Sequence, residues 1–514
     1  MIVSQIKSRS AQARPPWDAL GLGLAACLLL YLLQWVTLPK TALLNYRFET
    51  ISDYISSLRE IPWSYLDLCL SAVFAGVCIA LFIREYQNRC GTRFLGWATQ
   101  SERRTRTLVI LGGLVAVRFY FASGHLTWVA DAAYHTMYAW IAGEGLSQGL
   151  VLSWTPLVSA GTPFLQFYGF VFFYLAGLVY LLVEQIDVAL KIALGGAHIL
   201  SGLTIYLFVR EATRSRKAGL ISAAVYVLTF WHTQQILIMG RYPVSLVYAL
   251  LPVPFYAFTL AKRRENWGKV AFAGGATLAL LILTHPGYGF WATAFYVLHA
   301  GICWTVERCR RTRILRSGAV SICVALLLSS VLTLPMLIER GQTRLRTGLS
   351  LSDLPDPTLS QLLLWTNYQI RIGGSDFTAD HWYGGYVGLS AVLLCLAGIG
   401  VGLYRGSRKP TATQRAAVAG MILSLVLMFG YRWPIIADLP PVRALNAGRY
   451  ELFLVFFIAV LAGMALRPLA DCLRCSRWLS SSSDSTWDRL HSGNPFTTSR
   501  PKRRRAFPNP FTLS

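Results

Sequence analysis

The chain has 514 residues, of which 54% are hydrophobic and 14% charged, and its formal net charge is +24. Soluble domains carry about a quarter charged residues, so this composition excludes an ordinary soluble protein and is typical of an integral membrane protein. The excess Lys and Arg residues lie in short loops beside apolar runs, where membrane topology explains them better than nucleic-acid binding does. We therefore expect no nucleic-acid partner.

Twelve apolar stretches are long enough to cross a bilayer as helices, because about 20 residues span its hydrocarbon core. In chain order they are 18–38, 63–84, 107–123, 187–209, 218–234, 244–261, 268–284, 288–305, 316–337, 384–404, 413–431 and 450–467. They predict an all-α polytopic protein with about twelve transmembrane helices and a surrounding of membrane lipids.

The pattern divides the chain into an N-terminal hairpin with its loop (1–106), a transmembrane core (107–467) and a basic tail (468–514). The tail is rich in Ser and Pro and is predicted to be disordered. Three segments are long enough to fold outside the membrane, namely 124–186, 338–383 and 432–449. Chemistry that needs water and polar groups would lie in these external loops.

One further apolar stretch, "FLQFYGFVFFYLAGLVYLLV" (164–183), could also span. If it lies at the outer membrane surface instead, every dense cluster of Arg and Lys falls on the cytoplasmic side, as the positive-inside tendency favours. We therefore predict an interfacial helix here, with both termini in the cytoplasm.

The stretch "ADAAYHTMYAW" (130–140) carries an acid and an imidazole beside an apolar run. On a helix, Trp128, Asp131 and His135 share one stripe, since positions three and four apart are neighbours. A carboxylate at a membrane surface can act as a general base, and the imidazole could share or orient its proton. The alternative is a structural Asp–His pair that fixes a loop.

Further motifs follow in a characteristic order along 107–467. They are "GEGLSQGLVLSWTPLVSAGTPFLQFYGFVFFYLAGLVYLLV" (143–183), "KIALGGAHILSGLTIYLFVREATRSRKAGLISAAVYVL" (191–228), "GRYPVSLVYALLPVPF" (240–255), "THPGYGF" (284–290), "HWYGGYVGLSAVLL" (381–394) and "LPPVRALNAGRYELF" (439–453). This order resembles that of GT-C integral-membrane glycosyltransferases. It is more closely similar to bacterial membrane proteins labelled "6-pyruvoyl-tetrahydropterin synthase-related", a label that does not imply pterin chemistry.

The resemblance implies a GT-C-like fold and transfer of a sugar from a polyprenyl-phosphate donor to an extracytoplasmic acceptor. It implies that Asp131 deprotonates the acceptor hydroxyl, while His135 orients the acid or touches the sugar. A departing phosphate is best stabilised by arginines. The arginines at the predicted outer face are Arg118, Arg241, Arg371, Arg443 and Arg449. The alternative role for Arg118 is snorkelling to the outer headgroups, and for the other four it is that of an ordinary loop arginine.

Other candidate substrate-binding residues combine rings, which stack on sugars, with groups that bond hydroxyls. They are Trp128, Trp154, Tyr168, His285, Asp380 and His381. His285 opens a turn between two helices, so a packed or capping role also explains it.

Two positions depart from the GT-C pattern. The common Tyr-Pro-Pro at the start of the interfacial helix is here Tyr168-Gly169-Phe170, and the second external loop (231–243) lacks the acids of metal-using members. We therefore expect no metal and no cofactor, and either metal-independent transfer or no transfer.

Two other functions remain open. One is a flippase or transporter of lipid or polyprenyl-linked substrates, and the other is a non-catalytic protein of envelope assembly. The predicted spans are nearly free of acids at mid-depth, which argues against ion-coupled transport.

The topology is tested by single cysteines introduced at Leu150, Leu345 and Arg214 in a cysteine-free background. We expect a membrane-impermeant thiol reagent to label positions 150 and 345 from outside in intact cells, and to label position 214 only after permeabilisation. Labelling of 150 and 214 from the same side would overturn the interfacial assignment of 164–183.

Overall fold

The computed structural model describes residues 90–122, 131–158, 161–237, 240–339, 411–430 and 447–465, with positions 341, 387, 391–392, 395–396 and 433. All of these belong to one compact unit, Met1–Arg467, and the second unit, Pro468–Ser514, lies outside the described residues.

The described part is almost entirely helical. Its helices are α5 (Cys90–Ala98), α6 (Glu102–Ala122), α7 (Ala132–Ser147), α8 (Val171–Val183), α9 (Ile186–Thr213), α10 (Arg216–Leu228), α11 (Phe230–Leu237), α12 (Tyr242–Leu250), α13 (Pro252–Ala261), α14 (Trp267–Thr284), α15 (Pro286–Val306), α16 (Arg311–Ile338), α19 (Ala412–Phe429) and α22 (Glu451–Ala465). Short 3₁₀ turns, η1 (Arg308–Arg310) and η6 (Ala447–Tyr450), precede α16 and α22. Strands β1 (Trp154–Thr155) and β2 (Thr162–Pro163) form a small antiparallel hairpin.

Six helical stretches are long and apolar enough to cross a membrane, which confirms an all-α, multi-spanning protein. They are Ile186–Thr213, Tyr242–Ala261, Trp267–Thr284, Pro286–Val306, Arg308–Ile338 and Ala412–Phe429. Each coincides with a predicted span. The predicted spans 18–38, 63–84 and most of 384–404 lie outside the described residues, so the number twelve stays a prediction.

The predicted span 218–234 is interrupted. Helix α10 ends before Thr229, whose extended backbone (φ −63°, ψ 121°) breaks the helix before α11 begins. Helix α11 continues to Leu237 and buries the side chains of Trp231 and Gln235. Part of the stretch that the sequence assigned to an external loop is therefore a packed helix.

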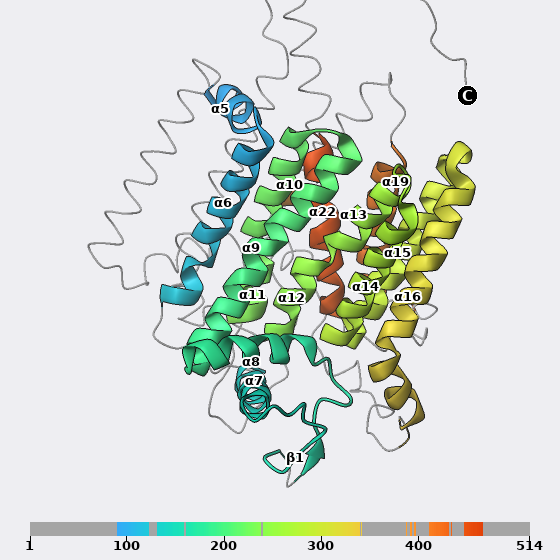
Figure 1. Ribbon diagram of the computed structural model, residues 1–514. Coiled ribbons are helices and arrows are strands. Elements are labelled where there is room, and N and C mark those ends of the chain that lie inside the picture. Colours follow the sequence, from blue (N-terminus) through green and yellow to red (C-terminus); the bar gives the residue numbers. More distant parts are fainter. Residues whose placement is uncertain are drawn as a thin grey trace, which may run out of the picture. The chain divides into compact units, whose positions relative to one another are not determined.

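Helices α7 and α8 lie across the ends of the long helices rather than beside them (Figure 1). Helix α8 has 13 residues, a length of about 20 Å, which is shorter than the roughly 30 Å hydrocarbon core of a bilayer. It packs against α7 and the start of α9. The prediction of a non-spanning helix in the first large loop is confirmed.

The other ends of the long helices carry a network of ion pairs, which we call the basic face. Glu102 pairs with Arg106, Arg210 and Arg216 (2.9, 3.0 and 3.5 Å). Glu211 pairs with Arg263 (2.9 Å) and Glu307 with Lys262 (2.6 Å). These contacts bring the basic clusters that begin or end α6, α9, α13 and α16 to one side, as the charge pattern predicted.

The aromatic core lies between the long helices. Phe208, Phe255 and Phe456 pack with ring centroids 5.1–6.0 Å apart, and Phe295 contacts Phe453 and Phe457 at 4.6 and 5.3 Å. Helix α22 is buried along its described length, so it forms the centre against which α9, α10 and α19 pack.

The crossing of α7 and α8 depends on glycine. A Cβ at Gly177 would lie 2.8 Å from the backbone nitrogen of Gly143, so Gly177→Ala must push the helices apart. We expect this variant to lose about 1–3 kcal/mol of stability, seen as a lower midpoint of thermal unfolding in detergent. Gly112→Ala is the matched control, because a Cβ there meets no atom within 4 Å. Equal midpoints for both variants would contradict the close crossing.

Candidate functional site

The first turn of α7 meets the segment that precedes α12. Gly240 has φ +60°, and a Cβ there would collide with the backbone of Ala132. Only glycine allows both this backbone conformation and this approach. The contact places Nε of Arg241 3.9 Å from Oδ2 of Asp131, across 110 residues of sequence.

The two partners of this ion pair differ in exposure. The Asp131 side chain is 53% exposed, whereas that of Arg241 is 5% exposed. Nη1 of Arg241 donates a 2.7 Å hydrogen bond to Oε1 of Gln235 in α11. The buried side-chain amide of Gln235 thus holds the guanidinium of Arg241 in place. The carboxylate of Asp131 lies next to this guanidinium and is exposed at the surface.

His135 is buried one turn further along α7, and both of its ring nitrogens are engaged. Nδ1–H donates a 2.6 Å hydrogen bond to the carbonyl oxygen of Gly240, and Nε2 accepts one of 3.3 Å from the Tyr168 hydroxyl. Burial lowers the pKa of His135 below its usual value, which favours this neutral tautomer. The imidazole therefore does not share a proton with Asp131, and it acts instead on the backbone that carries Arg241.

Tyr168 connects His135 to a second group of residues. Its ring lies 5.9 Å from that of His135 and 5.5 Å from that of His285. Arg449, in η6, is close enough for its charge to lower the pKa of both Tyr168 and His285, although burial dominates and raises that of Tyr168. Residues predicted from four separate motifs are therefore neighbours.

His285 also has a structural role, as the sequence suggested. It is the N-cap of α15, where Nδ1 accepts a 3.5 Å hydrogen bond from the Tyr288 backbone N–H. Burial lowers the pKa of His285 well below its usual value, and the nearby arginines add to this shift. The imidazole is thus kept neutral at the edge of a cationic site.

The structure explains the departure at Tyr168-Gly169-Phe170. A Cβ at Gly169 would collide with the carbonyl group of Thr284, at the end of α14. The Phe170 N–H donates a 2.8 Å hydrogen bond to the carbonyl oxygen of Leu283, a bond that proline lacks the hydrogen to make. Two prolines would therefore not fit here, and the segment is fastened directly to the end of α14.

Of the remaining predicted substrate-binding residues, the structure describes the side chain of Trp154 alone. Trp154 is 56% exposed in β1, and its indole lies against Gly161. The side chain of Arg118 and the residues Trp128, Asp380, His381 and Arg443 lie outside the described residues.

Three buried residues of the site were not singled out in the sequence. Gln235 accepts a hydrogen bond from Arg241. Tyr288 is buried, and the charges of Arg241, Arg449 and the fully buried Glu451 all influence its pKa, although burial is the main cause that raises it. Glu451 directly follows the "AGRY" motif and could have been flagged as an acid next to an apolar run. Nothing in the local sequence distinguishes Gln235.

No group of three or more His, Cys, Asp or Glu side chains is placed to hold a metal ion in the part of the chain that the structure describes. Of the acids in this region, Asp131 lies 3.9 Å from Nε of Arg241, and Glu451 is fully buried. Metal independence stays a prediction.

The family profile described as "6-pyruvoyl-tetrahydropterin synthase related domain; membrane protein" matches residues 165–480, more than half of the chain. The chain belongs to this family. No curated protein matches its sequence. The match includes Tyr168, Arg241, His285 and Arg449, whereas Asp131 and His135 precede it.

Three solved structures of the oligosaccharyltransferase of Archaeoglobus fulgidus are similar to this family member. The complex of AglB with an inhibitory peptide and a dolichol-phosphate is 14% identical, with a TM-score of 0.49, over 77% of this chain and 53% of that one. The apo form gives 13%, 0.47, 78% and 54%, and the form tethered to an acceptor peptide gives 14%, 0.49, 74% and 51%. This chain spans about half the length of those proteins.

The buried, neutral state of His135 predicts a pH dependence of stability. Because its pKa is lower in the folded than in the unfolded chain, the unfolded state takes up the proton first as the pH falls below about 6.5, and stability decreases by up to about 1.4 kcal/mol per pH unit. We expect the thermal midpoint of the wild type to fall more between about pH 7.5 and 5.5 than that of His135→Gln, which cannot titrate. His285 titrates in both proteins, so only the difference between them is diagnostic. Parallel curves would contradict a depressed pKa at His135.

Proposed function

We propose that this protein is a membrane glycosyltransferase of GT-C type, which transfers a sugar from a polyprenyl-phosphate donor to an acceptor outside the cytoplasm. The observation that carries the proposal is the half-exposed carboxylate of Asp131 beside the buried guanidinium of Arg241. Such a pair supplies two groups that an inverting transfer requires. The carboxylate can accept the proton of the attacking hydroxyl, and the positive charge can stabilise the phosphate that leaves the anomeric carbon.

Asp131 is the general base in this proposal. An acceptor hydroxyl must lose its proton as it attacks the anomeric carbon, and a positioned carboxylate accelerates such a step by about 10²–10⁴-fold. The exposure of Asp131 leaves it accessible to an acceptor. Arg241, held by Gln235 and the Gly240 contact, places its positive charge 3.9 Å from Oδ2 of Asp131 and attracts the carboxylate toward it.

Arg241 and Arg449 are the candidates for the departing phosphate. Fixed positive charges in a site with little water stabilise developing negative charge without having to reorganise during the reaction. Nε of Arg449 is buried and makes no hydrogen bond within the described ranges, so this guanidinium has a donor to offer an incoming oxygen. His135, Tyr168 and His285 support these groups from the buried side.

The depth of the site supports a lipid-linked donor. Arg241 immediately precedes the apolar span Tyr242–Ala261, and His285 separates the spans Trp267–Thr284 and Pro286–Val306. The charged groups therefore lie at the level where the phosphate of a membrane-embedded polyprenyl chain would be. The positive-inside tendency makes the basic face cytoplasmic, so the site would face the other side of a bacterial inner membrane.

The proposal is tested with Asp131→Asn. The full chain is reconstituted in liposomes with a panel of polyprenyl-phosphate sugars and an envelope extract as acceptor source, and released polyprenyl phosphate is measured. We expect the variant to lose about 10²–10⁴-fold in turnover while it retains donor binding, because the amide keeps the shape of the acid but not its basicity. The matched control is Glu144→Gln, an acid near the other end of α7 whose Oε1 accepts a 2.8 Å hydrogen bond from the Tyr180 hydroxyl.

Unchanged turnover in Asp131→Asn would end the assignment of Asp131 as the base. Movement of a labelled polyprenyl lipid between leaflets that is equal in wild type and variant, without sugar release in either, would favour a flippase over a transferase.

A further inference from the structure

A second charged region lies at the far end of the same helices. Arg241 and Lys262 flank the two ends of the apolar span Tyr242–Ala261, which has 20 residues and is therefore about 30 Å long. Lys262 belongs to the basic face, on the membrane surface opposite Asp131. Nothing at that face takes part in the proposed transfer.

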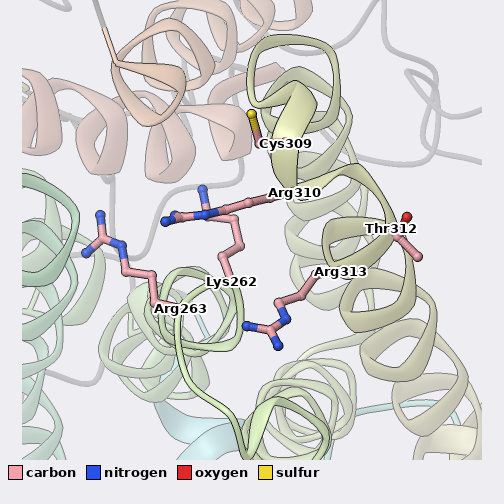
Figure 2. Close-up of a pocket in the computed structure, with 6 residues that line it drawn as sticks. All are labelled: Lys262, Arg263, Cys309, Arg310, Thr312 and Arg313. Carbon is pink, nitrogen blue, oxygen red and sulfur yellow. The ribbon is translucent and has the colours of Figure 1, made fainter.

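A pocket of about 300 Å³ opens on the basic face between the α13–α14 turn and the start of α16. Its lining consists of Lys262, Arg263, Cys309, Arg310, Thr312 and Arg313. Figure 2 shows Arg310 and Lys262 reaching toward each other across the pocket, Arg313 pointing into the same region from α16, and Thr312 turned away. Four of the six lining residues are cations, and none is an acid.

The surrounding acids do not balance this charge. Glu307 lies 2.6 Å from Nζ of Lys262 and 4.0 Å from Nη1 of Arg310, so one carboxylate serves two cations. Glu211 is engaged by Arg263. Among the residues that the structure describes, two acids thus pair with three of the four lining cations, and the buried amine of Lys262 (4% exposed) fixes one of the positive charges in place. A cavity with this surplus is suited to an anion.

We propose that this pocket binds a phosphate group at the membrane surface, most directly the headgroup phosphate of an anionic lipid. Guanidinium groups bind phosphate oxygens through paired hydrogen bonds, and three arginines line this pocket. Its volume is at the lower end of the range of ligand pockets, which suits a headgroup. Basic pockets between transmembrane helices commonly bind such headgroups. A soluble phosphate has the same chemistry, so the test separates the two sources.

Cys309 provides the reporter, because its thiol is free and exposed and the residue is one of those that line the pocket. The full chain is placed in nanodiscs of phosphatidylcholine, and the rate at which N-ethylmaleimide modifies Cys309 is followed by peptide mass spectrometry. The measurement is repeated with phosphatidylglycerol replacing part of the neutral lipid, and separately with inorganic phosphate at constant ionic strength. We expect bound headgroup to slow the reaction about tenfold when the lipid is at about ten times its Kd. Slowing by inorganic phosphate instead would assign the pocket to a soluble anion.

The charge of the lipid surface alone must be separated from occupancy of the pocket. Nanodiscs with the same charge supplied by oleate carry carboxylates but no phosphate, and we expect them to leave the rate unchanged. In Arg310→Gln/Arg313→Gln we expect protection to be lost. In Arg308→Gln/Arg316→Gln, which removes the same charge from exposed residues that do not line the pocket, we expect it to persist. Equal slowing by oleate, protection that persists without Arg310 and Arg313, or no slowing by either phosphate source would overturn the proposal.

Discussion

The contact between Gly240 and the first turn of α7 is the interaction on which the site depends. It brings together segments more than a hundred residues apart, and two consequences follow from it directly. Arg241 reaches Asp131, and the carbonyl of Gly240 accepts the Nδ1 proton of His135. A side chain at position 240 would meet the backbone of Ala132 and would also be strained at φ +60°. A substitution at Gly240 is therefore expected to disrupt both the Asp131–Arg241 ion pair and the hydrogen bond of His135.

The described charged residues at the two ends of the long helices are arranged differently. At the basic face, Glu102, Glu211 and Glu307 each collect one or more cations, and a surplus of positive charge remains in a pocket. At the face with Asp131, the guanidinium of Arg241 is buried and is held by the side-chain amide of Gln235, to which it donates a hydrogen bond.

The sequence predicted those features that the bilayer itself imposes. Apolar length predicted twelve spans, six of which coincide with described helices long and apolar enough to cross a membrane. The distribution of Arg and Lys predicted that the basic clusters lie on one side. It also named Asp131, Arg241, Tyr168, His285 and Arg449 from separate motifs, but could not show that they meet, because tertiary contacts alone decide it. Gln235 was placed in an external loop, since a polar run next to an apolar one does not reveal a packed helix such as α11. The sequence shows Gly169-Phe170 only as a departure from the Pro-Pro of the GT-C pattern. The structure explains it, because the carbonyl group of Thr284 leaves no room for a Cβ at position 169 and the carbonyl oxygen of Leu283 accepts the N–H of Phe170.

Asp131 and His135 illustrate why position on a helix stripe does not determine a shared function. They are four residues apart, yet one side chain is half exposed and the other is buried, and the imidazole uses both nitrogens for Gly240 and Tyr168. An imidazole bonded in this way has no lone pair left for a substrate, so in the proposed reaction the carboxylate would be the proton acceptor of the two. In that proposal His135 would act on Arg241 through the backbone at Gly240, as a positioning residue. Asp131 is thus paired with Arg241, whereas His135 is bonded to Gly240 and Tyr168. Gly240 links the two residues, because it contacts the first turn of α7 and immediately precedes Arg241.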